Sequence, residues 1–347
     1  MKDYCSVMVF TQGKQVPSTR FRVEYLKTAL DKRGVKLSLA NAHTSAYPPS
    51  SFKKRFLWIV TELLTRIKQV CKSQKHDAVI LQREFLSTLP TLEFLTKRPR
   101  ILDVDDAIWM HRKGWAANTI AKHADHIVCG NNFLAEYFKK FGKPITIIPT
   151  PVDTRRFISE TKVEPLKIIG WSGTSGGFRF LYSIQKTLAA VLKDNQGWKL
   201  RIVSDVPPIF TDIPEEDIEF IKWSVGDEVS TIASMDIGIM PLDDNEWSRG
   251  KCSYKMLLYM ACEVPVVVSD CGMNSEVLAH GPVGYGAVTE SDWYDYLTVL
   301  INDPIKRETA GKMGRKVVLD HYSVDQAIEK WEQVIKSVLP HKAYNID

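Results

Sequence analysis

The sequence lacks long apolar runs and clustered cysteines, and each absence excludes a class of protein. No stretch approaches the roughly 20 apolar residues that a membrane-spanning helix needs. The first residues, MKDYCSVMVF, do not combine a basic region, a long apolar core and a cleavage site, which argues against a secretory signal. The six cysteines form no C-x-x-C pair and have no histidine at zinc spacing. We therefore expect a cytoplasmic protein with reduced thiols and no metal site.

Positive charge is concentrated in the first half of the chain. Residues 1–150 hold 25 Lys and Arg against 12 Asp and Glu, whereas residues 151–347 hold 21 against 29. An excess of 13 positive charges indicates that the first half meets something anionic. A nucleic acid, an anionic membrane face and a phosphorylated substrate all fit this charge. No nucleic-acid-binding module is recognisable, so we expect no nucleic-acid partner.

Short apolar segments alternate with longer amphipathic ones, which is typical of parallel sheets built from β-α-β units. The expected strands are 5–10, 35–40, 77–81, 100–104, 126–129 and 145–148, followed by 166–171, 198–203, 218–223, 235–240 and 264–268. Two prolines in PTPVDTRRF interrupt the rhythm near residue 150, and a polar stretch through Pro165 is expected to be a linker. The pattern predicts an α/β fold with two Rossmann-like, doubly wound domains that face a central cleft.

The predicted domains are residues 1–150 and residues 151–320, since 347 residues suffice for two domains. Residues 321–347 are expected to form a C-terminal helix and tail that can pack back across the domains. This helix has an apolar stripe that is expected to face a core, made of Ala327, Ile328, Trp331 and Ile335.

Ligands of such sheets bind beyond the carboxyl ends of the strands. The loop at 170–177, GWSGTSGG, lies between an expected strand and the helix FRFLYSIQKTLAAVL. Small residues let the backbone approach a phosphate closely, and the amides at a helix N-terminus can donate to it. The spacing matches neither the G-x-G-x-x-G nor the Walker loop, so a plain strand-to-helix turn stays open as an alternative.

A second loop, MPLDDNEWSRGKCSYK, follows the strand that ends at Met240, and a helix is expected to begin near Ser253. Arg249, Lys251 and Lys255 surround this helix start, where the macrodipole disfavours cations. Three cations at that place indicate an external anion, for which a diphosphate is the natural candidate. A solvated basic edge is the alternative.

Three carboxylates, Asp103, Asp105 and Asp106, lie at the end of a strand in the basic half. They can act as a base, orient a hydroxyl or hold a metal, whereas a helix cap is the simpler interpretation. His111 follows closely and can titrate near neutral pH.

The loop after the first strand, GKQVPSTRFR, begins at Gly13, which permits a tight turn. Arg20 and Arg22 are expected to face an anionic group across the cleft. A role for Ser18 as a mere helix cap is equally compatible.

Residues 51–75 alternate Lys and Arg with Phe52, Phe56, Leu57, Trp58 and Leu63. This pattern suits an interfacial helix on an anionic membrane leaflet. A helix that covers a domain and has a basic outer face is the alternative.

Together these segments resemble a known family. GWSGT with its following helix, and DIGIMPLDDNEWSRGKCSYKMLLYMACEVPVVVS, are similar to the C-terminal domain of glycosyltransferase family 4, the glycosyl transferases group 1. PSTRFR, DVDDAIW, VCGNNFLAEYF and IIPTPVD look like the same branch, whose members carry a GKC-x-x-K-x-x-x-YMA segment.

The resemblance implies a GT-B fold, with an N-terminal acceptor domain and a C-terminal domain that binds a nucleoside-diphosphate sugar. It also implies transfer with retention of anomeric configuration to a glycan or lipid-linked glycan, in cell-surface polysaccharide assembly. No cofactor and no metal are required on this pattern, and a peripheral contact with the inner face of the membrane fits the acceptor.

The resemblance also assigns roles to residues. On the catalytic side it implies that Lys251 and Arg249 stabilise the leaving diphosphate. From their place after a strand of the basic half, we put Asp106 and His111 on the acceptor side as orienting groups or base. The donor-binding residues are Gly173, Thr174, Ser175, Glu246, Ser253, Tyr254 and Lys255. The remaining acceptor-side residues are Gly13, Arg20, Arg22 and Asp105.

The sequence departs from the family at two glutamates that lie eight positions apart. These two positions hold Gly250 and Leu258, and Glu263 replaces a usual glycine. Ribose recognition is therefore expected from Glu246 or Asp243. Two alternatives follow: a non-catalytic homologue that binds sugar nucleotides, and a GT-B nucleotide-sugar epimerase.

Overall fold

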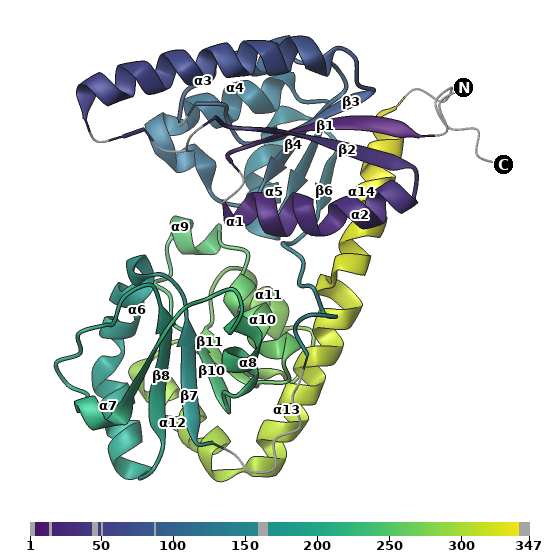
Figure 1. The fold of residues 1–347 in the computed structure, drawn as a ribbon. Helices are drawn as coiled ribbons and strands as arrows, with labels where there is room; N and C mark the ends of the chain where they lie inside the picture. The colour runs from purple at the N-terminus through teal and green to yellow at the C-terminus, as the bar shows by residue number, and fades with distance from the viewer. Residues whose placement is uncertain are drawn as a thin grey trace. The chain divides into compact units, whose positions relative to one another are not determined.

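The computed structural model describes residues 4–13, 16–43, 48–49, 51–86, 88–158 and 166–339. Residues 14–15 of the first loop, residues 159–165 of the expected linker and residues 340–347 of the tail lie outside this range. The chain forms two compact units (Figure 1). Unit 1 comprises Met1–Pro151, Gly250–Cys252 and Val324–Asp347, and unit 2 comprises Val152–Arg249 and Ser253–Ser323. The final helix thus belongs to unit 1, and the division falls one residue after the expected boundary.

Unit 1 is a six-stranded parallel sheet with the order β2-β1-β3-β4-β5-β6. Its strands are β1 (Cys5–Thr11), β2 (Val35–Asn41), β3 (Ala78–Gln82), β4 (Arg100–Val104), β5 (His126–Cys129) and β6 (Ile145–Ile147). Its helical elements are α1 (Pro17–Thr19), η1 (Arg20–Glu24), α2 (Tyr25–Lys32), α3 (Phe52–Ser73), η2 (Glu93–Leu95), η3 (Ile108–Gly114), α4 (Trp115–His123), α5 (Asn132–Phe138), η4 (Lys139–Phe141) and α14 (Val324–Val338). All six strands predicted in this half are confirmed, with ends displaced by at most one residue, because buried parallel strands read as short apolar runs.

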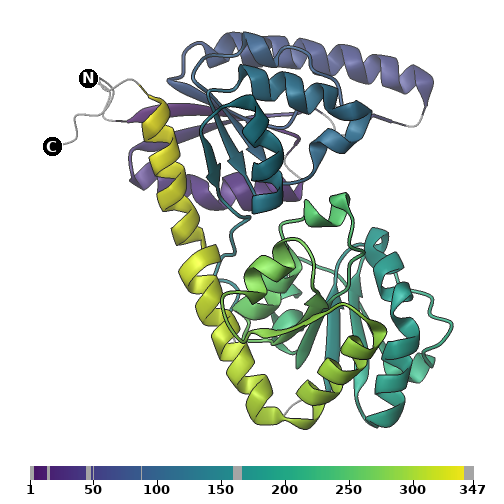
Figure 2. The same ribbon diagram turned by 180° about the vertical axis from the view of Figure 1, so that it is seen from behind.

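Helices cover both faces of this sheet, as the strand alternation requires (Figures 1 and 2). Val7 and Val9 of β1 share a core cluster with residues of α2 and α14. Met8 and Phe10 point the other way and join a cluster with residues of α3, α4 and α5. The apolar stripe predicted in the last helix is buried in the first of these clusters, as expected.

Unit 2 is a second six-stranded parallel sheet with the order β12-β11-β10-β7-β8-β9. Its strands are β7 (Ile168–Ser172), β8 (Lys199–Ser204), β9 (Ile218–Lys222), β10 (Ile237–Met240), β11 (Val266–Ser269) and β12 (Gly284–Ala287). Its helical elements are η5 (Ser175–Gly177), α6 (Phe178–Ser183), α7 (Gln185–Asp194), η6 (Glu215–Asp217), α8 (Glu228–Ala233), α9 (Glu246–Arg249), α10 (Tyr254–Ala261), α11 (Met273–Leu278), α12 (Glu290–Asn302), α13 (Pro304–Val317) and η7 (Val318–Tyr322). The five strands predicted in this half are confirmed, with ends displaced by up to two residues.

Two elements of unit 2 differ from the prediction. The edge strand β12 was not expected, because its sequence Gly-Tyr-Gly-Ala has low strand propensity. Gly284 has a φ of +151°, and a Cβ there would collide with the backbone of Val266 on the neighbouring strand. The single helix expected after Gly177 is two helices, α6 and α7, because Ile184 leaves helical geometry at φ −114° and ψ 11°.

No helix in the part of the chain that the structure describes is both long and apolar enough to cross a lipid bilayer.

Candidate functional site

The glycine-rich loop of unit 2 follows β7 and precedes α6, as predicted. Several of its amides already donate to protein acceptors: Gly173 N to the Val203 carbonyl at 2.9 Å and Gly177 N to the Thr174 carbonyl at 2.8 Å. Ser175 donates its amide to the Asp205 carboxylate at 2.7 Å and its hydroxyl to the same group at 3.0 Å. These bonds hold the loop in place, so the Gly173 and Ser175 amides differ from the open phosphate donors that the sequence suggested.

The glycines of this loop instead make room for a cation from α10. The Lys255 ammonium lies 4.3 Å from the centroid of the Trp171 indole, which is buried at the end of β7. A Cβ on Gly173 would collide with Lys255 Nζ, and one on Gly177 would lie 2.9 Å from the Trp171 ring and 3.6 Å from Lys255 Nζ. An aromatic face holds a cation without cancelling its charge. The loop therefore presents a positive charge at the carboxyl end of β7.

Helix α10 begins where the sequence predicted, directly after Ser253. Ser253 has left-handed geometry, with φ 48° and ψ 27°, and its side chain makes no capping bond to the helix. Its hydroxyl donates instead to Asn274 Oδ1 at 2.7 Å. The amides in the first turn of a helix have no acceptor within the helix. The Ser253 side chain thus leaves the first turn of α10 uncapped, and amides at such a helix N-terminus are suited to an anion.

The two exposed candidates on α9 lie at its ends. Arg249 ends the helix and donates to both oxygens of Asp244, at 2.7 Å from Nε and 2.9 Å from Nη2. This bond lowers the pKa of the Asp244 carboxyl. Glu246 begins the helix and is exposed. Arg249, which was expected to face a diphosphate, is thus already paired with Asp244. The sequence did not reveal this pair, because its two residues lie five positions apart in a polar loop.

In unit 1 the structure corrects the expectation for Arg22. Its side chain is buried, at 2% exposure, and its Nε donates to Asp103 Oδ2 at 3.1 Å. The same guanidinium donates to the Ile148 carbonyl at 2.9 Å and to Thr150 Oγ1 at 3.3 Å. Arg22 and Asp103 are therefore an internal pair that joins η1 to β4, rather than groups that meet an acceptor. Their separation of 81 positions in the sequence conceals this pairing.

The next two aspartates have a different environment. Asp106 Oδ1 accepts from Lys251 Nζ at 3.3 Å. Burial raises the pKa of Asp105 to about 6, the charge of Asp106 adds to this rise, and Arg22 and Arg83 oppose it. A carboxyl that exchanges its proton near neutral pH suits acid–base chemistry. Of the three aspartates at the end of β4, Asp103 thus has a structural role, whereas Asp105 and Asp106 are suited to acid–base chemistry.

Lys251 is held by backbone and side-chain bonds within unit 1. Asn131 donates its side-chain amide to the Lys251 carbonyl at 2.9 Å and accepts from Leu134 N at 2.8 Å as the cap of α5. Cys252 Sγ donates to the Asp105 carbonyl at 3.1 Å. Asn131 was missed as a site residue, although an Asn before a helix is a recognisable cap.

The two family glutamate positions are filled by residues that cannot replace them. A Cβ on Gly250 would lie 2.7 Å from the Ala107 Cβ and 3.0 Å from its amide nitrogen, so close backbone packing excludes a larger side chain. Leu258 is 5% exposed and faces the interior of unit 2.

The remaining acceptor-side candidates lie on loops of unit 1. Gly13 has a φ of +132°, which confirms the expected turn after β1. The Arg20 guanidinium lies 4.3 Å from the centroid of the Phe21 ring. His111 is exposed in η3, next to Arg112 and Lys113, which both have left-handed φ.

Across the described ranges of the chain, no three His, Cys, Asp or Glu side chains gather into a group that could hold a metal ion. That the protein needs no metal stays a prediction.

Comparisons with known proteins agree with this architecture. Residues 173–303 match the family model of the glycosyl transferases group 1, a segment that contains the glycine loop, α9 and α10. No curated protein matches the sequence.

Several solved structures share the fold at low identity. HepE from Anabaena, in complex with UDP and glucose, is 13% identical, with a TM-score of 0.67 over 96% of this chain and 100% of that chain. Sucrose-phosphate synthase from Thermosynechococcus elongatus is 12% identical, with a TM-score of 0.69 over 96% and 98%. WaaG, a glycosyltransferase involved in lipopolysaccharide biosynthesis, is 12% identical, with a TM-score of 0.65 over 95% and 99%.

These matches confirm the expected GT-B fold and the resemblance stated from the sequence. The two parallel six-stranded sheets thus have the GT-B fold, and residues 173–303 of unit 2 match the glycosyl transferases group 1.

Proposed function

We propose that the protein transfers a sugar from a UDP-sugar to a glycan or lipid-linked glycan acceptor during assembly of a cell-surface polysaccharide. The transfer retains the anomeric configuration and needs no metal, and the enzyme works at the cytoplasmic face of a membrane. Support for the donor comes from HepE, whose structures hold UDP, UDP-glucose, or UDP and glucose. Support for the acceptor class comes from WaaG and its role in lipopolysaccharide biosynthesis.

The observation that carries this proposal is the N-terminus of α10. Its first-turn amides are not capped by Ser253, and the Lys255 ammonium lies over Trp171 beside the glycine loop. Amides and a cation at a helix start are the groups that bind a diphosphate. The exposed carboxylate of Glu246 is the candidate ligand for the ribose.

Lys251 precedes α10 by three residues in the chain and is the group we assign to the leaving diphosphate. During transfer the bond from the anomeric carbon to the phosphate oxygen breaks, and negative charge builds on the UDP. A preorganised cation stabilises this charge more in the transition state than in the ground state. The bond to Asp106 keeps the Lys251 side chain ordered before the donor binds. Arg249 is already paired with Asp244, so we expect it to contribute less than Lys251 to stabilising the diphosphate.

On the acceptor side, a new bond forms between the acceptor oxygen and the anomeric carbon, and the hydroxyl proton must leave. We assign orientation of this hydroxyl to Asp106 and the exchange of its proton to Asp105, whose pKa is raised to about 6. His111, exposed on η3, is the second candidate for the base.

The first test is Lys251→Ala. Loss of one preorganised charge contact should raise the barrier by about 2.7–4 kcal/mol, which lowers kcat by about 100- to 1,000-fold. The melting temperature should stay unchanged, and Lys251→Arg, which keeps the charge, serves as the matched control. An unaltered kcat in the alanine variant would remove Lys251 from the mechanism.

One observation favours a second candidate, a homologue that binds sugar nucleotides without transferring sugar. Both family glutamates are missing, at Gly250 and Leu258. A thermal-shift screen against UDP, GDP, dTDP and CMP sugars identifies the donor, because a ligand at 100 times its Kd stabilises the fold by about 2.7 kcal/mol. Donor consumption with and without acceptor then separates a transferase from an epimerase, which needs no acceptor, and from a protein that only binds.

A further inference from the structure

Helix α3 of unit 1 buries two charged side chains beside Trp58 and Val70 and exposes apolar side chains on its other side. Glu62 and Arg66, both charged, have side chains that are 1% exposed. On the other side of the helix Leu57 is 64% exposed and Leu64 is 56% exposed. A helix on the surface of a globular domain normally buries its apolar face and exposes its charges. This arrangement in α3 needs an explanation.

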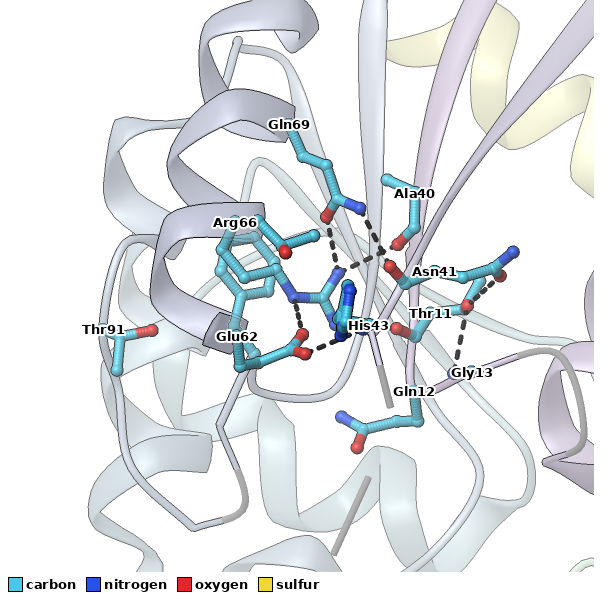
Figure 3. A network of polar contacts seen from close by, with 12 residues as sticks. Thr11, Gln12, Gly13, Ala40, Asn41, His43, Glu62, Arg66, Gln69 and Thr91 are labelled. Carbon is cyan, nitrogen blue, oxygen red and sulfur yellow. Dashed lines mark hydrogen bonds and ion pairs between the residues drawn. The ribbon is translucent and has the colours of Figure 1, made fainter. Parts of the chain in front are cut away.

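The polar network in Figure 3 fixes how α3 is turned about its axis. Arg66 donates to the Thr11 carbonyl at 2.8 Å and to the Ala40 carbonyl at 2.9 Å, near the carboxyl ends of β1 and β2. Its Nε pairs with Glu62 at 2.9 Å, and Glu62 accepts from the His43 amide at 2.8 Å. A roll of the helix would leave these buried charges unpaired, which is costly. The buried bonds of Glu62 and Arg66 therefore hold α3 with its exposed apolar side chains directed outward.

The outward face carries a continuous apolar stripe. Its members lie three and four residues apart in alternation, which places them on one side of a helix. They are Leu57, Val60, Leu64, Ile67 and Cys71, with Phe56 beside them at 70% exposure. Trp58, which the sequence suggested for this set, is instead buried against the domain, and the side chain of Phe52 lies outside the described residues.

Charge identifies what covers the stripe. The exposed charged residues of α3 are all basic, namely Lys53, Lys54, Arg55, Lys68 and Lys72. The single acidic residue of the helix, Glu62, is buried and paired. A second copy of the chain on this face would bring two such sets of cations together. An anionic lipid surface neutralises them and accepts the apolar stripe at the same time.

We infer that α3 lies in the plane of an anionic lipid membrane, with the Leu57–Cys71 stripe in the acyl boundary and the lysines at the headgroups. This docking surface is independent of the donor chemistry proposed above. It rests on the membrane location given in the proposed function. Flotation needs no nucleotide, so its failure would remove that location and leave the donor chemistry standing.

The test is flotation of the full chain with phosphatidylcholine vesicles, with and without phosphatidylglycerol. The wild-type protein should float with the anionic vesicles and stay behind with the neutral ones. Lys68→Ala with Lys72→Ala should weaken binding by roughly 25-fold, since each cation near the surface contributes about fivefold. Added salt should weaken wild-type binding in the same direction.

The stripe itself is tested by Leu57→Glu with Leu64→Glu, which should abolish flotation. Both positions are exposed, so the circular dichroism melt should not change. Ile305→Glu on α13, where the side chain is 77% exposed, is the matched control and should float like wild type.

Three results would overturn the inference. They are equal flotation with neutral and anionic vesicles, equal loss in the stripe and control variants, and a dimer in light scattering that the stripe variant dissociates while vesicles bind neither protein. The last result would assign the stripe to a second copy of the chain.

Discussion

Each unit places a cation at the carboxyl end of the first strand of its sheet, but the two cations have different neighbours. In unit 1, Arg66 bonds to the Thr11 carbonyl of β1 and pairs with the buried Glu62. In unit 2, Lys255 lies on the Trp171 indole of β7 beside Gly173. Arg66 also lies over the Phe85 ring, so the difference is that Arg66 is paired with a buried carboxylate and serves the fold, whereas Lys255 lies beside the glycine loop, where we expect it to meet a ligand. Two equivalent places in two similar sheets thus have different uses.

The largest expected effect is on stability, from Arg66→Met. Removal of one partner of a buried ion pair leaves Glu62 uncompensated, which should lower the free energy of unfolding by about 3–5 kcal/mol. Lys255→Met should change it by less than about 1 kcal/mol, because Met keeps an unbranched side chain of similar length against the Trp171 ring. Urea unfolding of the two variants measures the difference.

The double variant Glu62→Gln with Arg66→Met is the control, and should recover part of the loss. If Lys255→Met destabilised the protein as much as Arg66→Met, the distinction between the two cations would not hold.

The second expected effect is on donor affinity, from Lys255→Met. A hydrogen bond to a charged phosphate contributes about 1.5–3 kcal/mol, so the Kd for UDP should rise by about 10- to 100-fold. Isothermal titration measures this change, and Lys255→Arg should retain most of the affinity.

Two glycines of the loop give a matched control for the position of Lys255. A Cβ on Gly173 would displace the ammonium, whereas one on Gly176 would come no closer than 3.8 Å to Thr174 Oγ1. Gly173→Ala should therefore weaken UDP binding, and Gly176→Ala should not. Equal affinities in these two variants would argue against the location of the cation.

Sequence patterns predicted the strands well, but they predicted the ion pairs between distant side chains poorly. Strands such as 100–104 and 126–129 were predicted to the residue, because a buried parallel strand reads as an apolar run. The start of α10 after Ser253 was predicted from the strand–loop–helix order. The Arg22–Asp103 pair was not, because its partners are distant in the sequence and a buried arginine looks like an exposed one. The sequence suggested an interfacial helix at 51–75 as one of two alternatives, but which side of α3 is buried depends on strand carbonyls that only the fold supplies.

A third expected effect concerns pH and the carboxylates of unit 1. Asp103 has a buried partner, whereas burial disfavours the charged form of Asp105. The folded-state pKa of Asp105 is about 6, above the ordinary value of 3.8. Between about pH 4 and pH 6 the folded state therefore binds more protons than the unfolded state, and stability falls as pH rises. Above pH 6 this penalty stays constant.

Asp105→Asn removes the titrating group. Between pH 4 and pH 6 the free energy of unfolding of the wild type should fall relative to that of the variant. Above pH 6 the difference between the two proteins should stay constant. Urea unfolding at a series of pH values tests this, and parallel curves throughout would contradict the raised pKa.

The central claim is that the diphosphate of a sugar nucleotide binds at the N-terminus of α10. Amide hydrogen exchange of Tyr254, Lys255 and Met256, measured with and without saturating UDP, tests it most directly. Exchange at these three amides should slow when UDP is bound, because they then donate to phosphate oxygens. Unchanged exchange at these amides, with UDP bound to the protein, would show that the diphosphate lies elsewhere.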